Sequence, residues 1–267
     1  MTALGDRLDQ IKAEGRSALI GYLPVGYPSV EVSVRAMQAM VEAGVDVVEV
    51  GLPYSDPVMD GATIQHAAEA ALERGVRVAD VFAAVRGVVE AGAPAVVMSY
   101  WNPILQYGPE RFADDLLAAG GSGVILPDIT PDSGAGWAEV AAGRELDTVH
   151  LVALTTTPER MHLTCKASSG FVYAAALMGV TGERSVIGGG VEELVERARE
   201  AGAPRVCVGL GVTTGQHAAQ VARYADGVIV GSALVRCLVE SPDDVEAGLD
   251  ALRAKTQELA AGVRGLV

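Results

Sequence analysis

Two of the three carboxylates in the segment VEVGLPYSDPVMDGATIQ, residues 48–65, have types and positions that could do chemistry together. Glu49 belongs to an apolar stretch typical of a buried strand, and Asp60 follows in a loop rich in Gly and Pro. Burial penalises the charged form of a carboxyl group, so we expect a raised pKa for Glu49, which suits proton transfer. The pair predicts general acid–base catalysis. The alternative is that Glu49 binds a buried polar group and Asp60 only shapes a turn.

Strand periodicity predicts the direction of the Glu49 side chain. Alternation places Val45, Val47, Glu49 and Gly51 on one face and the residues between them on the other. We expect the first face to point into the centre of the fold and the second to pack against helices.

Three glycine-rich stretches late in the chain could bind an anion: GVTG at 179–182, GLG at 209–211, and Gly231 with Ser232. Backbone N–H groups at such turns and at helix N-termini bind phosphate, and glycine permits close approach. Each stretch alone is as typical of an ordinary turn. The three together indicate a phosphate site.

Apolar and aromatic residues at or near strand ends could enclose a flat apolar ligand, although most residues of this kind belong to a core. These candidates are Tyr22, Met98, Tyr100, Ile125, Val152, Tyr173 and Leu210.

Short apolar segments alternate with helical patterns along the whole chain, which is typical of parallel strands joined by helices. Eight such units predict a single-domain (β/α)8 TIM barrel over residues 1–267, with a doubly wound open sheet as the alternative. The expected strands are 18–25, 45–51, 95–100, 123–128, 148–154, 171–176, 205–211 and 227–232.

The connections after the second and sixth expected strands are longer than the others. Because the loops that follow the strands of such a barrel form its active face, we expect enlarged loops there, one of which could serve as a lid. The opening residues, MTALGDRLDQIKAEG, predict an extra amphipathic helix before the barrel.

Composition excludes several classes of function. Twenty Lys and Arg against 34 Asp and Glu give a formal net charge of −14, which would repel nucleic acid and anionic membranes. The three cysteines, Cys165, Cys207 and Cys237, form no CxxC or Cys/His cluster, so neither disulfides nor a metal site are predicted. Without a signal peptide or a membrane span, the chain is expected to be soluble and cytoplasmic.

Several motifs resemble the tryptophan synthase alpha subunit family: EVGLPYSDPVMDG, MSYWNPILQYGPERF, GVILPDITPD, GVTG, VGLGV and ADGVIVGSALV. They follow the family's order over about residues 21–235. The resemblance implies reversible retro-aldol cleavage of indole-3-glycerol phosphate into indole and glyceraldehyde 3-phosphate, in tryptophan biosynthesis. It also implies that this chain needs no metal or cofactor.

The resemblance also assigns roles to residues. Glu49 would protonate the indole ring carbon that loses its side chain and take the proton of the adjacent glycerol hydroxyl. Asp60 would hold the indole N–H and stabilise positive charge on the ring, and Thr181 on the lid would orient Asp60. The matching phosphate positions are Gly182, Gly211, Gly231 and Ser232, and the matching indole-pocket positions are Tyr173 and Leu210.

A partner subunit is implied as well. Pro53 and Asp56 match the loop that meets a PLP-dependent beta subunit, which receives indole through a tunnel in an alpha2-beta2 complex. No nucleic-acid or membrane partner is expected. Met59, Ala176 and Leu177 depart from the family pattern and could alter lid closure or communication with that subunit.

Three other functions stay open. The chain could be a stand-alone lyase that supplies free indole, a non-catalytic activator of a beta subunit, or another phosphate-binding barrel enzyme such as a sugar-phosphate isomerase. The presence of both acids counts against an activator, and the specific second loop counts against an isomerase.

Overall fold

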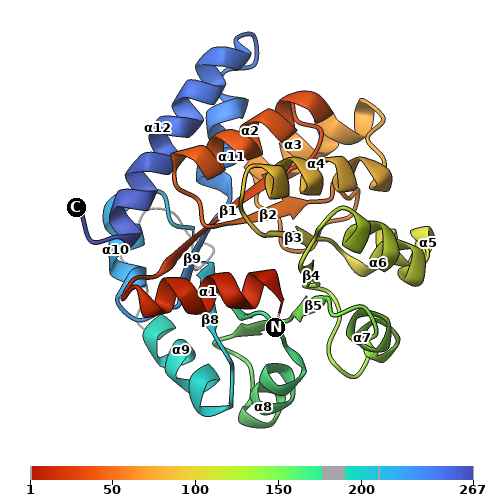
Figure 1. Ribbon diagram of the computed structural model, residues 1–267, viewed down its shortest axis with the longest axis vertical. Helices are drawn as coiled ribbons and strands as arrows, with labels where there is room; N and C mark the ends of the chain where they lie inside the picture. Colours follow the sequence, from red (N-terminus) through yellow and green to blue (C-terminus); the bar gives the residue numbers. More distant parts are fainter. Residues whose placement is uncertain (1, 176–189, 210, 267) are drawn as a thin grey trace.

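Parallel strands form a barrel inside a ring of helices in the computed structural model, which describes residues 2–175, 190–209 and 211–266 (Figure 1). In this part of the chain the strands make one nine-stranded sheet in the order β5-β4-β3-β2-β1-β9-β8-β7-β6, and every pairing is parallel. The strands are β1 (Ala18–Pro24), β2 (Val47–Gly51), β3 (Ala95–Met98), β4 (Gly123–Ile125), β5 (Asp147–Val149), β6 (Leu151–Ala153), β7 (Val172–Ala175), β8 (Val206–Gly209) and β9 (Gly227–Val230).

The two edge strands of this sheet are consecutive in sequence. Only His150 separates β5 from β6, so together they form one bent strand that joins the two edges of the sheet. They occupy the position of the single strand expected at 148–154. The predicted (β/α)8 barrel is therefore confirmed, and a doubly wound open sheet, which has two separate edges, is excluded.

Helices surround the barrel, and Figure 1 shows α1 lying across one of its ends. Thr2 caps α1, which confirms the expected extra helix at the N-terminus. The described helices are α1 (Ala3–Ala13), α2 (Val30–Ala43), α3 (Ala62–Glu73), α4 (Val78–Glu90), α5 (Trp101–Tyr107), α6 (Pro109–Ala118), α7 (Ala135–Ala142), α8 (Pro158–Ala167), α9 (Val191–Glu200), α10 (Gly215–Ala222), α11 (Ser232–Val239) and α12 (Val245–Val263).

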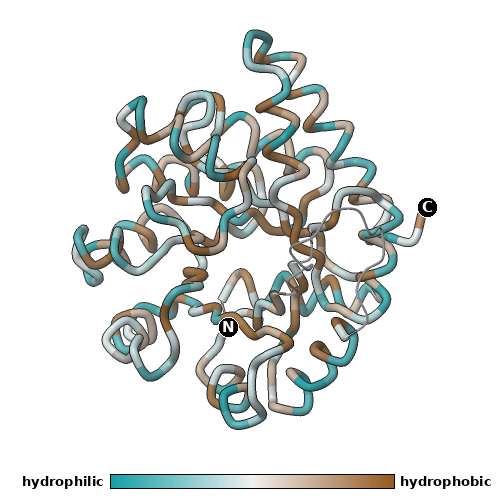
Figure 2. The backbone as a smooth tube through the Cα atoms, turned by 180° about the vertical axis from the view of Figure 1, so that it is seen from behind, coloured by the Kyte–Doolittle hydropathy of each residue, from teal (hydrophilic) through white to brown (hydrophobic). Residues whose placement is uncertain are grey.

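Two apolar layers hold the barrel together. Apolar residues concentrate along the central strands, while hydrophilic residues lie mainly on the outer helices (Figure 2). Val48 and Val50 belong to the outer layer between sheet and helices, whereas Val47 belongs to the inner one. The inner layer is Leu4, Leu8 and Ile11 of α1 with Ala18, Ile20, Val47, Val96, Ile125, Val149, Phe171, Cys207 and Ile229.

The expected inner position of Val45 is wrong. Its N–H donates to the carbonyl of Met40 as the chain leaves α2, and the side chain packs in the outer layer. Strand β2 begins only at Val47, so the alternation counted from Val45 does not apply before that residue.

The long connection after β2 contains helix α3 in addition to α4. The expected enlargement is thus present, and much of it is helical. The second expected enlargement, after β7, falls on residues 176–189, outside the described residues. None of the helices described here is long and apolar enough to span a membrane.

Candidate active site

Glu49 lies on β2 with its side chain inside the barrel. It is 4% exposed, and its Oε2 atom has no hydrogen-bond partner among the described residues. Burial, and secondarily the negative charge of Asp60, raises the pKa of Glu49 to about 8. The carboxyl group is therefore mostly protonated at neutral pH and can both donate and accept a proton near that pH.

Asp60 is oriented by a tyrosine from the next strand connection. The Tyr100 hydroxyl donates to Asp60 Oδ1 at 3.1 Å and accepts the Met59 N–H at 3.1 Å. Burial raises the pKa of Asp60, and the bond from Tyr100 opposes that rise. Burial also raises the pKa of Tyr100 to about 12, so its hydroxyl keeps its proton. Asp60 therefore faces the cavity in a fixed orientation.

Tyr22 and Tyr173 point into the barrel, and each ring lies against a glycine of a neighbouring strand. A Cβ atom at Gly51 would lie 2.5 Å from the Tyr22 hydroxyl oxygen, and one at Gly209 would lie 2.3 Å from that of Tyr173. Any larger residue at either position would displace the ring. The two glycines thus make room for the tyrosines that border the acids.

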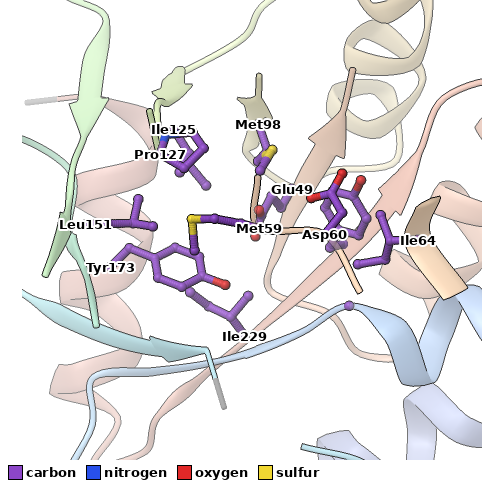
Figure 3. Close-up of a pocket in the computed structure, with 12 residues that line it drawn as sticks. Glu49, Met59, Asp60, Ile64, Met98, Ile125, Pro127, Leu151, Tyr173 and Ile229 are labelled. Atoms are coloured by element: carbon purple, nitrogen blue, oxygen red, sulfur yellow. The ribbon is translucent and has the colours of Figure 1, made fainter. Parts of the chain in front are cut away.

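The acids and tyrosines share one cavity of about 110 Å³ (Figure 3). Apart from the acids its walls are mainly apolar, which keeps Glu49 away from bulk water. The residues lining it are Tyr22, Glu49, Met59, Asp60, Ile64, Met98, Ile125, Pro127, Leu151, Tyr173, Ile229 and Gly231.

Most of the apolar candidates from the sequence lie at this cavity. Tyr22, Met98, Ile125 and Tyr173 line it, and Tyr100 reaches it through its bond to Asp60. Leu210 lies outside the described residues.

The expected position of Val152 is wrong. It packs in the outer layer, and its neighbour Leu151 lines the cavity instead. The Thr148 hydroxyl likewise faces outward, where it accepts the Trp137 indole N–H at 3.1 Å. Apolar residues occur on both faces of the stretch, so periodicity alone could not decide which residues point inward.

Four further lining residues were not anticipated. Pro127 comes two residues after Ile125, and Ile229 comes two residues before Gly231. Because Ile125 and Gly231 also line the cavity, strand alternation could have found both residues. To find Leu151, one had to know which face of the stretch 148–154 points inward. Ile64 comes from α3 and had no signal in the sequence.

The phosphate candidates are only partly described. Gly231 lines the cavity and is the N-cap of α11, whose first residue is Ser232. Gly211 is exposed with φ of +64°, a left-handed conformation that favours glycine. Gly182 and Thr181 lie outside the described residues.

Of the proposed partner contacts, Asp56 is exposed and Pro53 is buried. Within the described ranges, no three His, Cys, Asp or Glu residues are placed to hold a metal ion.

Sequence comparison finds close relatives over nearly the whole chain. A family model described as tryptophan synthase alpha chain matches residues 8–264. The tryptophan synthase alpha chain of Mycobacterium intracellulare is 56% identical over 261 residues, which cover 98% of this chain and 94% of that protein. The corresponding chain of Mycobacterium tuberculosis strain H37Ra is 55% identical with the same coverage.

Solved structures agree with the sequence comparison. A crystal structure of tryptophan synthase from M. tuberculosis in an open form matches with a TM-score of 0.91 and 52% identity, covering 99% of both chains. The alpha subunit from Legionella pneumophila strain Paris matches with a TM-score of 0.87 at 32% identity, again covering 99% of both. With the family model spanning the barrel and both acids, the chain belongs to the tryptophan synthase alpha chain family.

Proposed function

We propose that this protein cleaves indole-3-glycerol phosphate into indole and glyceraldehyde 3-phosphate, with Glu49 and Asp60 as the catalytic residues. The observation that carries the proposal is a buried carboxyl group, Glu49, whose Oε2 has no partner among the described residues and which shares an apolar cavity with Asp60. Membership of the tryptophan synthase alpha chain family supports the same reaction.

Glu49 moves the protons. With a pKa of about 8 it is available in both forms at neutral pH. The protonated form delivers a proton to the indole ring carbon that loses the glycerol side chain. The carboxylate takes the proton of the adjacent hydroxyl, and the carbon–carbon bond breaks as that carbon becomes an aldehyde.

Asp60 stabilises charge. Protonation of the ring carbon makes the ring system cationic, and a carboxylate near the ring N–H favours that state in a site with little water. The Tyr100 hydroxyl holds Asp60 Oδ1, which leaves Oδ2 for the ring nitrogen. Thr181, which we expect to orient Asp60 from the lid, completes this arrangement.

The phosphate end of the substrate binds at the glycine-rich turns. The first N–H groups of a helix have no acceptor within the helix, so the start of α11 at Ser232 beside Gly231 can bind an anion. Gly182 and Gly211 complete the proposed phosphate site. Tyr22, Met98, Ile125, Tyr173 and Leu210 enclose the ring in the proposal.

The protein functions with a beta subunit in an alpha2-beta2 complex, and PLP is needed only in that subunit. Two of the similar solved structures are crystal structures of tryptophan synthase from M. tuberculosis, which supports a partnership of this kind. The proposed contacts are Asp56, exposed on the loop after β2, and Pro53, buried near the start of that loop. The cysteines Cys165, Cys207 and Cys237 are all free thiols, which fits the reducing cytoplasm.

Incubation of the purified chain with indole-3-glycerol phosphate tests the proposal. We expect indole release, which rises strongly when the beta subunit is added. Equal turnover with and without that subunit would identify a stand-alone lyase. No indole under either condition, from a chain that still activates the beta subunit, would identify a non-catalytic activator and contradict the proposed reaction.

A further inference from the structure

The Met59 side chain lies across the cavity that contains the two acids. Figure 3 shows its thioether extending away from Asp60 towards Leu151 and Tyr173, which line the same cavity. Met59 is nevertheless 44% exposed. A side chain that is partly in the cavity and partly in solvent occupies the opening between the two.

The space left beside Met59 is small for an organic ligand. The cavity measures about 110 Å³, whereas pockets that bind small organic molecules commonly measure about 300–1,000 Å³. Tyr22 and Ile125 are buried side chains on barrel strands, where close packing resists displacement. Met59 stands on a loop and is half-exposed, so it is the lining residue that can move aside most easily.

The backbone of Met59 is anchored independently of its side chain. Its N–H donates to the Tyr100 hydroxyl at 3.1 Å, and the same hydroxyl donates to Asp60. Methionine is unbranched and adapts its shape through three rotatable side-chain bonds. The thioether can therefore rotate into solvent while Asp60 keeps its orientation.

We propose that the Met59 side chain blocks part of the ring subsite, the part of the cavity that takes the substrate's ring, and moves aside when the ring binds. Its size thereby determines which ring sizes the subsite accepts. In the free protein the thioether fills part of the space that a bicyclic ring requires. The arriving ring displaces the thioether, and the remaining bulk of the side chain limits substituents on the ring. This inference rests on the proposed function, and it assigns Met59 a role in specificity rather than in proton transfer.

Substituted indoles test the role in specificity. In the synthetic direction, with glyceraldehyde 3-phosphate, we compare kcat/KM for indole and for ring-methylated indoles. The ratio of methylindole to indole should rise about tenfold or more in Met59→Ala, since a pocket discriminates a methyl-sized group by about 10–200-fold. Met59→Leu, which keeps the bulk, should retain the parent ratio.

A matched control separates this effect from a general loss of apolar surface. Leu105 on α5 is 50% exposed and is not among the residues that line the cavity. Leu105→Ala should leave the ratio unchanged. An unchanged ratio in a folded Met59→Ala protein overturns the proposal, with folding checked by its thermal midpoint. Absence of any reaction of the parent with plain indole instead contradicts the proposed function.

A binding measurement tests the displacement itself, without catalysis. The full chain is labelled with 13C at the methionine methyl groups, and Met59→Leu identifies the Met59 signal. Titration with indole should shift that signal, while the signal of Met37, buried on α2, stays in place. A Met59 signal that does not move at saturating indole overturns the proposal, whereas an absence of indole binding contradicts the proposed function on which it rests.

Discussion

Acid side chains at the two ends of the barrel meet opposite environments. Before β9, Asp226 accepts the Val206 N–H at 2.9 Å and pairs with Lys12 and Arg199. Inside the other end, Glu49 has an oxygen without a partner among the described residues. Burial would raise the pKa of Asp226, but its hydrogen bonds and cations outweigh burial and lower it, whereas the pKa of Glu49 rises to about 8.

The contrast separates carboxylates that hold the structure together from a carboxyl group that is set for proton transfer. Asp46, before β2, likewise accepts bonds from Arg7, Arg16 and the Leu19 N–H. A carboxylate with several donors is stabilised in its charged form and holds the helices to the barrel. A carboxyl group without such donors keeps a proton that it can transfer near neutral pH.

The largest expected effect is on turnover. Glu49→Gln removes the only group that we propose to move protons, so kcat for indole release should fall by about 10²–10⁴-fold. Asp226→Asn, the matched substitution at the other end, should keep kcat within a few-fold of the parent once the protein is folded. Similar losses in both variants would contradict the division between the two ends.

The pH dependence of stability provides the next test. The folded chain holds the Glu49 proton up to about pH 8, whereas the unfolded chain releases it near 4.5. The stabilisation from this proton is complete below pH 4.5 and is lost as pH rises through about 8. Glu49→Gln lacks the dependence, so its free energy of unfolding relative to the parent should increase by up to about 1.4 kcal/mol per pH unit in that window. Urea unfolding at pH 5, 6.5 and 8 measures the trend, and a flat difference would refute it.

For Asp226, at the other end of the barrel, the contribution to stability changes with pH in the opposite direction. Because the pKa of Asp226 is lowered on folding, its stabilisation is present above about pH 4 and is lost as pH falls through the folded value. Asp226→Asn should therefore lower the free energy of unfolding at pH 7 by about 1–3 kcal/mol. The deficit should shrink in acid. A deficit of equal size at pH 7 and pH 3 would show that charge is not its cause.

The smallest predicted effect concerns the orientation of Asp60. Tyr100→Phe removes the hydroxyl that binds Asp60 and the Met59 N–H. We expect kcat to fall about tenfold, the usual worth of one such hydrogen bond, and the acid limb of the pH profile to move upward because the bond lowers the pKa of Asp60. Tyr54→Phe is the control, since Tyr54 stacks on Tyr100 with ring centroids 5.1 Å apart. Equal effects of the two substitutions would argue against a role for the hydroxyl.

Sequence patterns alone were enough to predict the repeat of strands and helices and the inward direction of Glu49. Both follow from periodicity within short segments, where Glu49 alternates with Val48 and Val50 of the outer layer. The prediction failed at 148–154, because apolar residues occur on both faces of that stretch and the wrong face was taken as the inward one. It put Val152 at the cavity in place of Leu151.

The chemical setting of the two acids depends on contacts that form only in the folded chain. Tyr100 reaches Asp60 from 40 residues away in the chain. Glu49 Oε2 is buried without a hydrogen-bond donor among the described residues, which depends on all the strands around it. The raised pKa of Glu49 follows from that enclosure. Local sequence fixes which way a side chain points from its own strand, whereas desolvation and long-range hydrogen bonds depend on every element that closes around it.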